Sequence, residues 1–188
     1  MRVIGGMYRG RTLRTVADLS VRPATDRVRQ TIFDMLATRL ELEGAHVLDL
    51  FAGSGSLGIE ALSRGAARAT FVESAHAAAA FITHNLRALG CQGAADVLET
   101  DAMALLAPGT GTWNLVFADP PYAWERTAEI PRLAFEGGLI RSGGYLLIEH
   151  PPAVAFAHSA SYRPGPVKRF GRTHVTFFTP SEGRMEVP

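Results

Sequence analysis

Apolar residues follow two alternating periods along most of the chain. From His46 to Glu149, short apolar runs that are typical of buried strands alternate with segments in which apolar residues recur at helical spacing. Strands are predicted over 46–50, 69–73, 96–100, 113–118 and 144–149, and helices over 57–63, 75–89 and 127–135, the last interrupted by Pro131. This alternation is typical of right-handed βαβ units. It predicts an α/β fold with a doubly wound, mostly parallel sheet.

The N-terminal part departs from this pattern. Two short β-like stretches, 2–6 and 11–16, with Gly10 between them, predict a small hairpin. Apolar residues at helical spacing then predict a helix over 26–43 that ends at Gly44.

The C-terminal part contains two further apolar runs, 167–170 and 174–178, on either side of Gly171. They predict an antiparallel hairpin at the edge of the sheet. No internal repeat or low-complexity tract is present. We therefore expect an N-terminal hairpin and helix, residues 1–44, followed by a main domain, residues 45–188.

The distribution of charge is more informative than its total. The formal net charge is +1, but residues 1–30 hold seven Arg and two Asp, a net of +5. Residues 45–150 have a net charge of −5, and residues 151–188 have +3. A polyanion is attracted to such basic ends and a cationic small molecule to the acidic centre.

Composition excludes several classes of protein. A chain of 188 residues with 47% hydrophobic residues is ordinary for a globular protein. No apolar run approaches 18 residues and the first residues lack the apolar core of a signal peptide, so neither a membrane span nor export is expected. The lone Cys91 excludes an internal disulfide, and the six His show no ligand spacing, so no metal is expected. We expect a cytoplasmic monomer.

A glycine-rich loop follows the first strand of the alternating region. Its spacing is G-x-G-x-x-G, at Gly53, Gly55 and Gly58, and Glu73 lies twenty residues after the first glycine. Taken alone, this spacing is typical of dinucleotide binding. Asp49, four residues before the first glycine, would repel a pyrophosphate. It suits instead the ammonium and sulfonium groups of S-adenosylmethionine.

The other cofactor contacts follow from the strand ends. Glu73, after the second strand, can accept both ribose hydroxyls, and Asp101, after the third, can bind the adenine amino group. Open α/β sheets bind ligands at these carboxyl ends of their strands. The residues expected to bind the cofactor are Asp49, Phe51, Gly53, Ser54, Gly55, Gly58, Glu73, Asp101 and Ala102.

The tetrad Asp119-Pro120-Pro121-Tyr122 follows the fourth strand and is expected to be catalytic. Two consecutive prolines make a stiff loop whose polar groups can face a ligand. An exocyclic amine is a poor nucleophile because its lone pair is delocalised into the ring. The Asp119 carboxylate and the Pro120 carbonyl can accept both N–H groups and orient the lone pair, and Tyr122 can stack on a base.

The chain resembles the RsmD family of bacterial 16S rRNA guanine-N2 methyltransferases over essentially its whole length. The resemblance is carried by the N-terminal segments 2–6, 9–11 and 22–29, by the loop 51–55 and by its continuation 58–66. It implies a Rossmann-like class I methyltransferase fold, S-adenosylmethionine as cofactor and the N2 amine of one guanine in 16S rRNA as target. The 30S particle, assembled or assembling, is the implied substrate.

The basic N-terminal part is expected to dock on RNA. Its arginines would neutralise phosphates and orient the substrate, leaving the choice of base to the pocket. The arginines concerned are Arg2, Arg9, Arg11, Arg14, Arg22, Arg27 and Arg29.

Three other functions compete with this interpretation. A DNA base methyltransferase would usually need an added recognition domain, for which 188 residues leave no room. A non-enzymatic RNA-binding protein would not need the loop glycines or Asp119. A nicotinamide oxidoreductase is disfavoured by Asp49 and by the tetrad.

Overall fold

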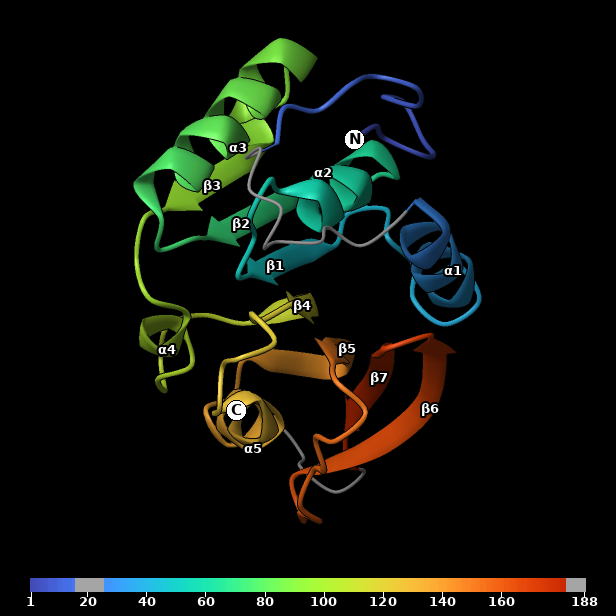
Figure 1. The fold of residues 1–188 in the computed structure, drawn as a ribbon, viewed down its shortest axis with the longest axis vertical. Helices are drawn as coiled ribbons and strands as arrows, with labels where there is room; N and C mark the ends of the chain where they lie inside the picture. Colours follow the sequence, from blue (N-terminus) through green and yellow to red (C-terminus); the bar gives the residue numbers. More distant parts are fainter. Residues whose placement is uncertain (16–25, 182–188) are drawn as a thin grey trace. The chain divides into compact units, whose positions relative to one another are not determined.

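A computed structural model describes residues 1–15 and 26–181 (Figure 1). The chain forms two units, Met1–Ala102 and Met103–Pro188. The division expected from the sequence, at residue 44, is a division by function and stays a prediction.

The first unit is built on three parallel strands, β1 (His46–Leu50), β2 (Arg68–Val72) and β3 (Ala95–Leu98), in the order β3-β2-β1. Four of the five residues of β1 are buried. A strand covered on both faces is expected to be apolar throughout, so Asp49 is an exception within β1. Asp49 pairs in register with Phe71 of β2.

Four helices, together with the 3₁₀ turn η1 (Gln92–Ala94), accompany or follow these strands: α1 (Asp26–Leu36), α2 (Ser56–Ser63), α3 (His76–Leu89) and α4 (Ala102–Leu105). Every residue of α2 is buried, because the helix packs on β1 and β2 (Figure 1). Gly90 ends α3 in the left-handed conformation, as its place in the sequence predicts. The short helix α4 was not predicted.

The helix predicted over 26–43 is too long: α1 ends at Leu36. The carbonyl of Met35 accepts hydrogen bonds from the Thr38 hydroxyl, at 3.1 Å, and from the Arg39 guanidinium, at 2.7 Å. Side chains that satisfy the last carbonyls end a helix. Apolar residues continue at helical spacing beyond Leu36, although the helix itself ends there.

The predicted N-terminal hairpin is present in a reduced form. An isolated antiparallel bridge joins Arg2 to Thr12, and the Val3 amide donates to the Arg11 carbonyl at 2.9 Å. The Gly10 amide donates back to the Val3 carbonyl at 2.9 Å. Val16, the last residue of the predicted hairpin, lies outside the described residues.

The second unit has four strands, β4 (Trp113–Ala118), β5 (Ile140–His150), β6 (Tyr162–Phe170) and β7 (Thr173–Pro180), in the order β4-β5-β7-β6. β4 and β5 are parallel, whereas β7 runs antiparallel to both β5 and β6. The predicted C-terminal hairpin at the sheet edge is therefore confirmed, with Gly171 at a φ of +61° in its turn.

The predicted helix over 127–135 is divided into a 3₁₀ turn, η2 (Thr127–Glu129), and α5 (Ile130–Glu136). Pro131 lies in the first turn of α5, where its missing amide removes no helical hydrogen bond. The interruption thus falls before the proline. Phe135 of α5 stacks on Tyr162 at a centroid distance of 5.5 Å and anchors the helix to the start of β6.

Candidate functional site

The glycine-rich loop turns the chain sharply between β1 and α2. Phe51, the first residue after β1, has a φ of +59° and is the one non-glycine residue with a positive φ in the described part of the chain. Such a conformation costs free energy and is found most often at functional sites. Gly53 and Gly55 follow at φ values of +55° and +76°, so the loop contains three left-handed residues within five positions.

The three glycines of the motif have different local surroundings. A Cβ added to Gly58 would lie 2.4 Å from the ring of Phe71, so this glycine lets α2 approach β2 closely. A Cβ on Gly55 would lie 3.2 Å from the side chains of Phe71 and Ile82. Apart from Gly53 and its two chain neighbours, no heavy atom of the described residues lies within 4 Å of a Cβ built on Gly53. Its backbone is therefore open to a ligand, which fits a cofactor that lies against the loop.

Asp49 is a buried carboxylate beneath this loop. It is 2% exposed, and its Oδ2 accepts a hydrogen bond from the Gly58 amide at 2.9 Å. Burial raises the pKa of Asp49 to about 7; the neighbouring charge of Glu73 adds to the rise, and the Gly58 amide opposes it. A cationic ligand would stabilise the ionised form of this carboxylate.

Glu73 ties the loop to the start of α3. Its Oε2 accepts a hydrogen bond from the Gly53 amide at 2.9 Å, and its Oε1 accepts one from the Ala75 amide at 2.8 Å. Each carboxylate oxygen has a second lone pair, so Glu73 retains acceptors for a diol. The sequence placed Glu73 correctly at a strand end, but did not reveal that it also holds the loop.

Asp101 lies three residues beyond the end of β3 and directly before α4. It is exposed, whereas Ala102, the first residue of α4, is buried. The first unit thus brings the loop, Asp49 and Glu73 together and places Asp101 in the connection after the third strand.

The tetrad belongs to the second unit and follows β4. Ala118, the last residue of β4, is buried, Asp119 is half-buried and Pro120 is buried. Tyr122 is 54% exposed, and its hydroxyl is hydrogen-bonded to the hydroxyl of Thr173 at the start of β7. An exposed aromatic ring held at its far end is suited to stacking on a base.

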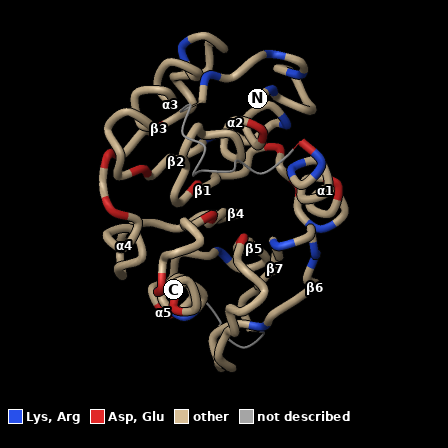
Figure 2. The backbone as a smooth tube through the Cα atoms, viewed as in Figure 1, with Lys and Arg blue, Asp and Glu red and all other residues tan. Residues whose placement is uncertain are grey.

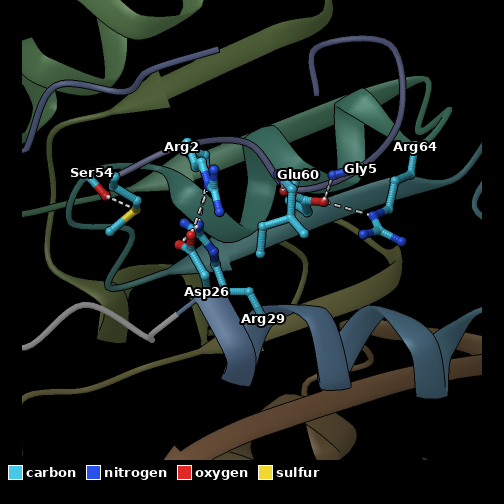
Figure 3. Close-up of polar contacts among 9 residues, drawn as sticks. Arg2, Gly5, Asp26, Arg29, Ser54, Glu60 and Arg64 are labelled. Carbon is cyan, nitrogen blue, oxygen red and sulfur yellow. Dashed lines mark hydrogen bonds and ion pairs between the residues drawn. The ribbon is translucent and has the colours of Figure 1, made fainter. Parts of the chain in front are cut away.

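Hydrogen bonds join the N-terminal residues to α2 (Figure 3). Both carboxylate oxygens of Glu60, which is 1% exposed, accept backbone hydrogen bonds at 2.8 Å, one from Ile4 and one from Gly5. Arg64 also pairs with Glu60 at 2.8 Å. At Gly6, φ is +74° and a Cβ would lie 1.7 Å from the Ser63 carbonyl oxygen, so only glycine fits.

Asn85 of α3 joins the N-terminal residues to the glycine-rich loop. Its side chain accepts from the Arg14 amide at 2.8 Å and donates to the carbonyls of Arg14, at 2.9 Å, and Ser54, at 3.2 Å. Sequence reasoning missed the roles of Asn85 and Glu60. The one available signal was a polar residue at a position of each helix where the spacing predicts an apolar one. That signal does not indicate which residues the side chain binds.

Most of the predicted RNA-contacting arginines are exposed, including Arg9, Arg11, Arg14 and Arg27. The side chain of Arg2 is 69% exposed and pairs with Asp26 at 3.1 Å. Arg22 lies outside the described residues.

Arg29 requires a correction. Its side chain is fully buried, where it donates to the Arg2 carbonyl at 2.6 Å and pairs with Asp26 at 2.9 Å. Burial lowers the pKa of Arg29, and the charges of Asp26 and Glu60 oppose this shift. The prediction that Arg29 contacts phosphate is therefore wrong for this structure, because its guanidinium joins α1 to the N-terminal residues.

None of the helices in the part of the chain that the structure describes has the length and hydropathy needed to span a bilayer. Within the same residues, no group of three or more His, Cys, Asp and Glu is arranged to hold a metal ion.

Comparison with known proteins identifies the family. The family model described as conserved hypothetical protein 95 matches residues 1–179. The chain belongs to this family. It is also 40% identical, over 79% of its own length and 74% of the relative's, to ribosomal RNA small subunit methyltransferase D of Escherichia coli. The resemblance to the RsmD family is thereby confirmed.

Comparison with solved structures confirms the fold. A candidate methyltransferase of Escherichia coli matches with a TM-score of 0.84 and 35% identity, covering 96% of this chain and 98% of the other. An RNA methyltransferase of Salinibacter ruber, in complex with S-adenosyl-L-homocysteine, matches with a TM-score of 0.66 and 14% identity, covering 88% and 97%. The predicted Rossmann-like α/β fold with antiparallel C-terminal strands is confirmed.

Proposed function

We propose that this protein transfers a methyl group from S-adenosylmethionine to the N2 amine of a guanine in small-subunit rRNA, on the assembled or assembling 30S particle. The observation on which this proposal rests is the glycine-rich loop, held between Asp49 and Glu73, in a chain 40% identical to ribosomal RNA small subunit methyltransferase D. A protein with this function acts in the bacterial cytoplasm.

S-adenosylmethionine supplies an electrophilic methyl group on its sulfonium. The first unit would bind it with the open backbone at Gly53, the carboxylate of Asp49 and the remaining lone pairs of Glu73. The acidic character of this site suits a ligand that bears two positive charges. Asp101, in the connection after β3, and Ala102, the first residue of α4, would contact the adenine.

The second unit would present the amine. The Asp119 carboxylate and the Pro120 carbonyl would accept its two N–H groups, which turns the nitrogen lone pair toward the methyl group. The nitrogen would become positively charged as its bond to the methyl carbon forms and the sulfonium C–S bond breaks, which leaves S-adenosylhomocysteine. The Asp119 carboxylate would stabilise that charge until the proton passes to solvent. Tyr122, with its exposed ring, would stack on the extruded guanine.

The docking surface would include the exposed arginines of the first unit: Arg2, Arg9, Arg11, Arg14 and Arg27. Contacts to phosphates orient a nucleic acid without reading its sequence. The shape of the rRNA would then select the guanine that reaches the tetrad.

The deciding experiment identifies the methylated nucleoside. Purified protein and labelled S-adenosylmethionine are incubated with 30S particles that lack the modification, with naked 16S rRNA, or with DNA, and the product is digested to nucleosides. We expect N2-methylguanosine from 30S particles. Methylated adenine from DNA would replace the proposal with a DNA methyltransferase, and no transfer to any substrate at a measured cofactor affinity would favour a binding protein.

A further inference from the structure

The charged residues in the C-terminal part of the second unit are almost all basic. Residues 151–180 contain no Asp or Glu. The basic residues of this stretch lie along β6 and in its turn, as Figure 2 shows, and they are Arg163, Lys168, Arg169 and Arg172. We call the segment Tyr162–Pro180, with these four side chains, the basic hairpin. Its charge contrasts with the net −5 of residues 45–150.

The basic hairpin is accessible along almost its whole outer strand. β6 is the last strand in the sheet order, and every residue from Arg163 to Arg169 is exposed. Among the described residues, no ion pair involves Lys168, Arg169 or Arg172, whereas two exposed arginines elsewhere in the unit, Arg126 and Arg132, each pair with a glutamate on the same helical segment.

Strand register relates the basic hairpin to the tetrad. Phe170 pairs with Thr173, and Lys168 pairs with Val175. Residues paired across antiparallel strands share a face, and every second residue returns to it, so Lys168 lies on the same face as Thr173. Thr173 is the residue whose hydroxyl bonds to Tyr122. Arg172 lies in the turn, next to Thr173.

Charged residues on an edge strand can also serve only to prevent pairing with another chain. That role does not require the charged residues to lie near the tetrad. Here the hairpin turn ends at Thr173, whose hydroxyl bonds to Tyr122, so the hairpin that carries the cations also contacts the aromatic residue of the tetrad.

We propose that the basic hairpin binds the phosphate backbone of the RNA substrate next to the target nucleotide. This inference rests on the proposed function and adds to it a docking surface on the second unit. Lys168 and Arg172 would contact phosphates while Tyr122 stacks on the base, so that the nucleotide is held at both its backbone and its ring.

Lys168 is the only lysine of the chain, which allows a direct test. An amine-specific acetylating reagent, applied to the protein alone and with excess 16S rRNA fragment, modifies Lys168 and the terminal amine, and mass spectrometry measures each site. We expect the RNA to slow acetylation of Lys168 at least fivefold, and high salt to restore the rate. Equal rates with and without bound RNA would overturn the inference.

A pair of variants tests the same surface independently. Lys168→Ala with Arg172→Ala is compared with Arg132→Ala and Arg141→Ala, which removes the same charge from α5 and β5. Each phosphate contact contributes about 0.7–0.9 to the slope of log affinity against log salt. We expect the hairpin variant to flatten this slope by about one to two, and to raise KM for RNA more than it lowers kcat. The control should retain the slope.

The outcomes separate this inference from the proposed function. If the parent methylates rRNA and the hairpin variant binds it with the parent's affinity and slope, the inference is wrong and the function stands. If the parent binds RNA but methylates none, the proposed function is wrong, and the acetylation and salt measurements still decide whether the hairpin binds RNA. An unfolding temperature equal to that of the parent establishes that both variants are folded.

Discussion

The Oδ2 atom of Asp49 accepts a hydrogen bond from the amide of Gly58, 2.9 Å away, in an environment where the carboxylate is 2% exposed. One buried acid therefore supports the glycine-rich loop and also provides negative charge for a cationic ligand.

The contribution of Asp49 to stability is predicted to fall as pH rises from about 4 to about 7. Burial raises the pKa of Asp49 to about 7, so in this window the folded protein binds a proton that the unfolded chain releases. Burial also raises the pKa of Glu149 to about 7, with the same sign. Urea unfolding of the parent at pH 5 and pH 8 should differ by a few kcal/mol, since one pKa unit corresponds to about 1.4 kcal/mol. Asp49→Asn should remove part of the difference, and an unchanged difference would contradict the assignment.

Glu73→Ala is predicted to weaken binding of S-adenosylmethionine by tenfold or more. The change removes both an acceptor for the ribose and the bond that holds the Gly53 amide, and a hydrogen bond to a charged group contributes about 1.5–3 kcal/mol. Isothermal calorimetry measures the affinity. Glu99→Ala, an exposed acid in the same unit, is the matched control and should bind like the parent. Parental affinity in both Glu73→Ala and Asp49→Ala would rule out this cofactor site.

Asp119→Ala is predicted to lower kcat by about 10²–10³ while leaving cofactor affinity within a factor of about two, because its partner is the amine and not the cofactor. Single-turnover methylation and calorimetry measure the two quantities separately. Tyr122→Phe keeps the ring and removes only the hydroxyl that bonds to Thr173, so its loss should be smaller. Near-parental turnover by Asp119→Ala would exclude the tetrad from the chemistry.

Replacing Arg9, Arg11 and Arg14 together by Ala is predicted to weaken RNA binding and to lower its salt dependence by roughly one unit of slope for each phosphate that is no longer neutralised. All three are exposed, and Arg11 additionally donates to the Ala88 carbonyl at 2.9 Å. Filter binding at several salt concentrations measures the slope. Cofactor affinity should be retained. A triple variant with the parent's slope would place the docking surface elsewhere.

Glu60→Ala is predicted to destabilise the protein by about 3 kcal/mol, because it leaves the amides of Ile4 and Gly5 and the guanidinium of Arg64 without their buried acceptor. Denaturant unfolding measures the loss. Glu41→Ala, at an exposed position after α1, should change stability by less than about 0.5 kcal/mol. Equal effects of the two changes would show that the N-terminal residues contribute little to stability.

The alternating strands and helices could be predicted from the sequence because short apolar runs and helical spacing distinguish the two kinds of element. β1 and β4 have the predicted bounds, and α3 ends at Gly90 as expected. The error at the end of α1 has a local cause: Thr38 and Arg39 satisfy the carbonyl of Met35, and the periodicity of apolar residues contains no information on such side-chain bonds.

The candidate site could be predicted only in part, for a similar reason. Motif spacing located Asp49, Glu73 and the tetrad, since each lies near or just after the end of a strand. The burial of Arg29 and the role of Glu60 depend on contacts between residues 27 and 56 positions apart, which spacing along one segment does not reveal. A charge count treats Arg29 and Arg27 alike, although one is buried and the other exposed.

The bond from Arg29 to the Arg2 carbonyl has a consequence for the order in which the fold opens. If residues 1–14 opened alone, the buried guanidinium of Arg29 would keep its ion pair with Asp26 inside α1 but would lose the Arg2 carbonyl that accepts its other hydrogen bond. Residues 1–14 and α1 should therefore open together as one cooperative unit, before the strands of the first unit separate. In native-state hydrogen exchange, the amides of Ile4 and Gly5, which belong to no strand, should exchange with the same opening free energy as the central amides of α1.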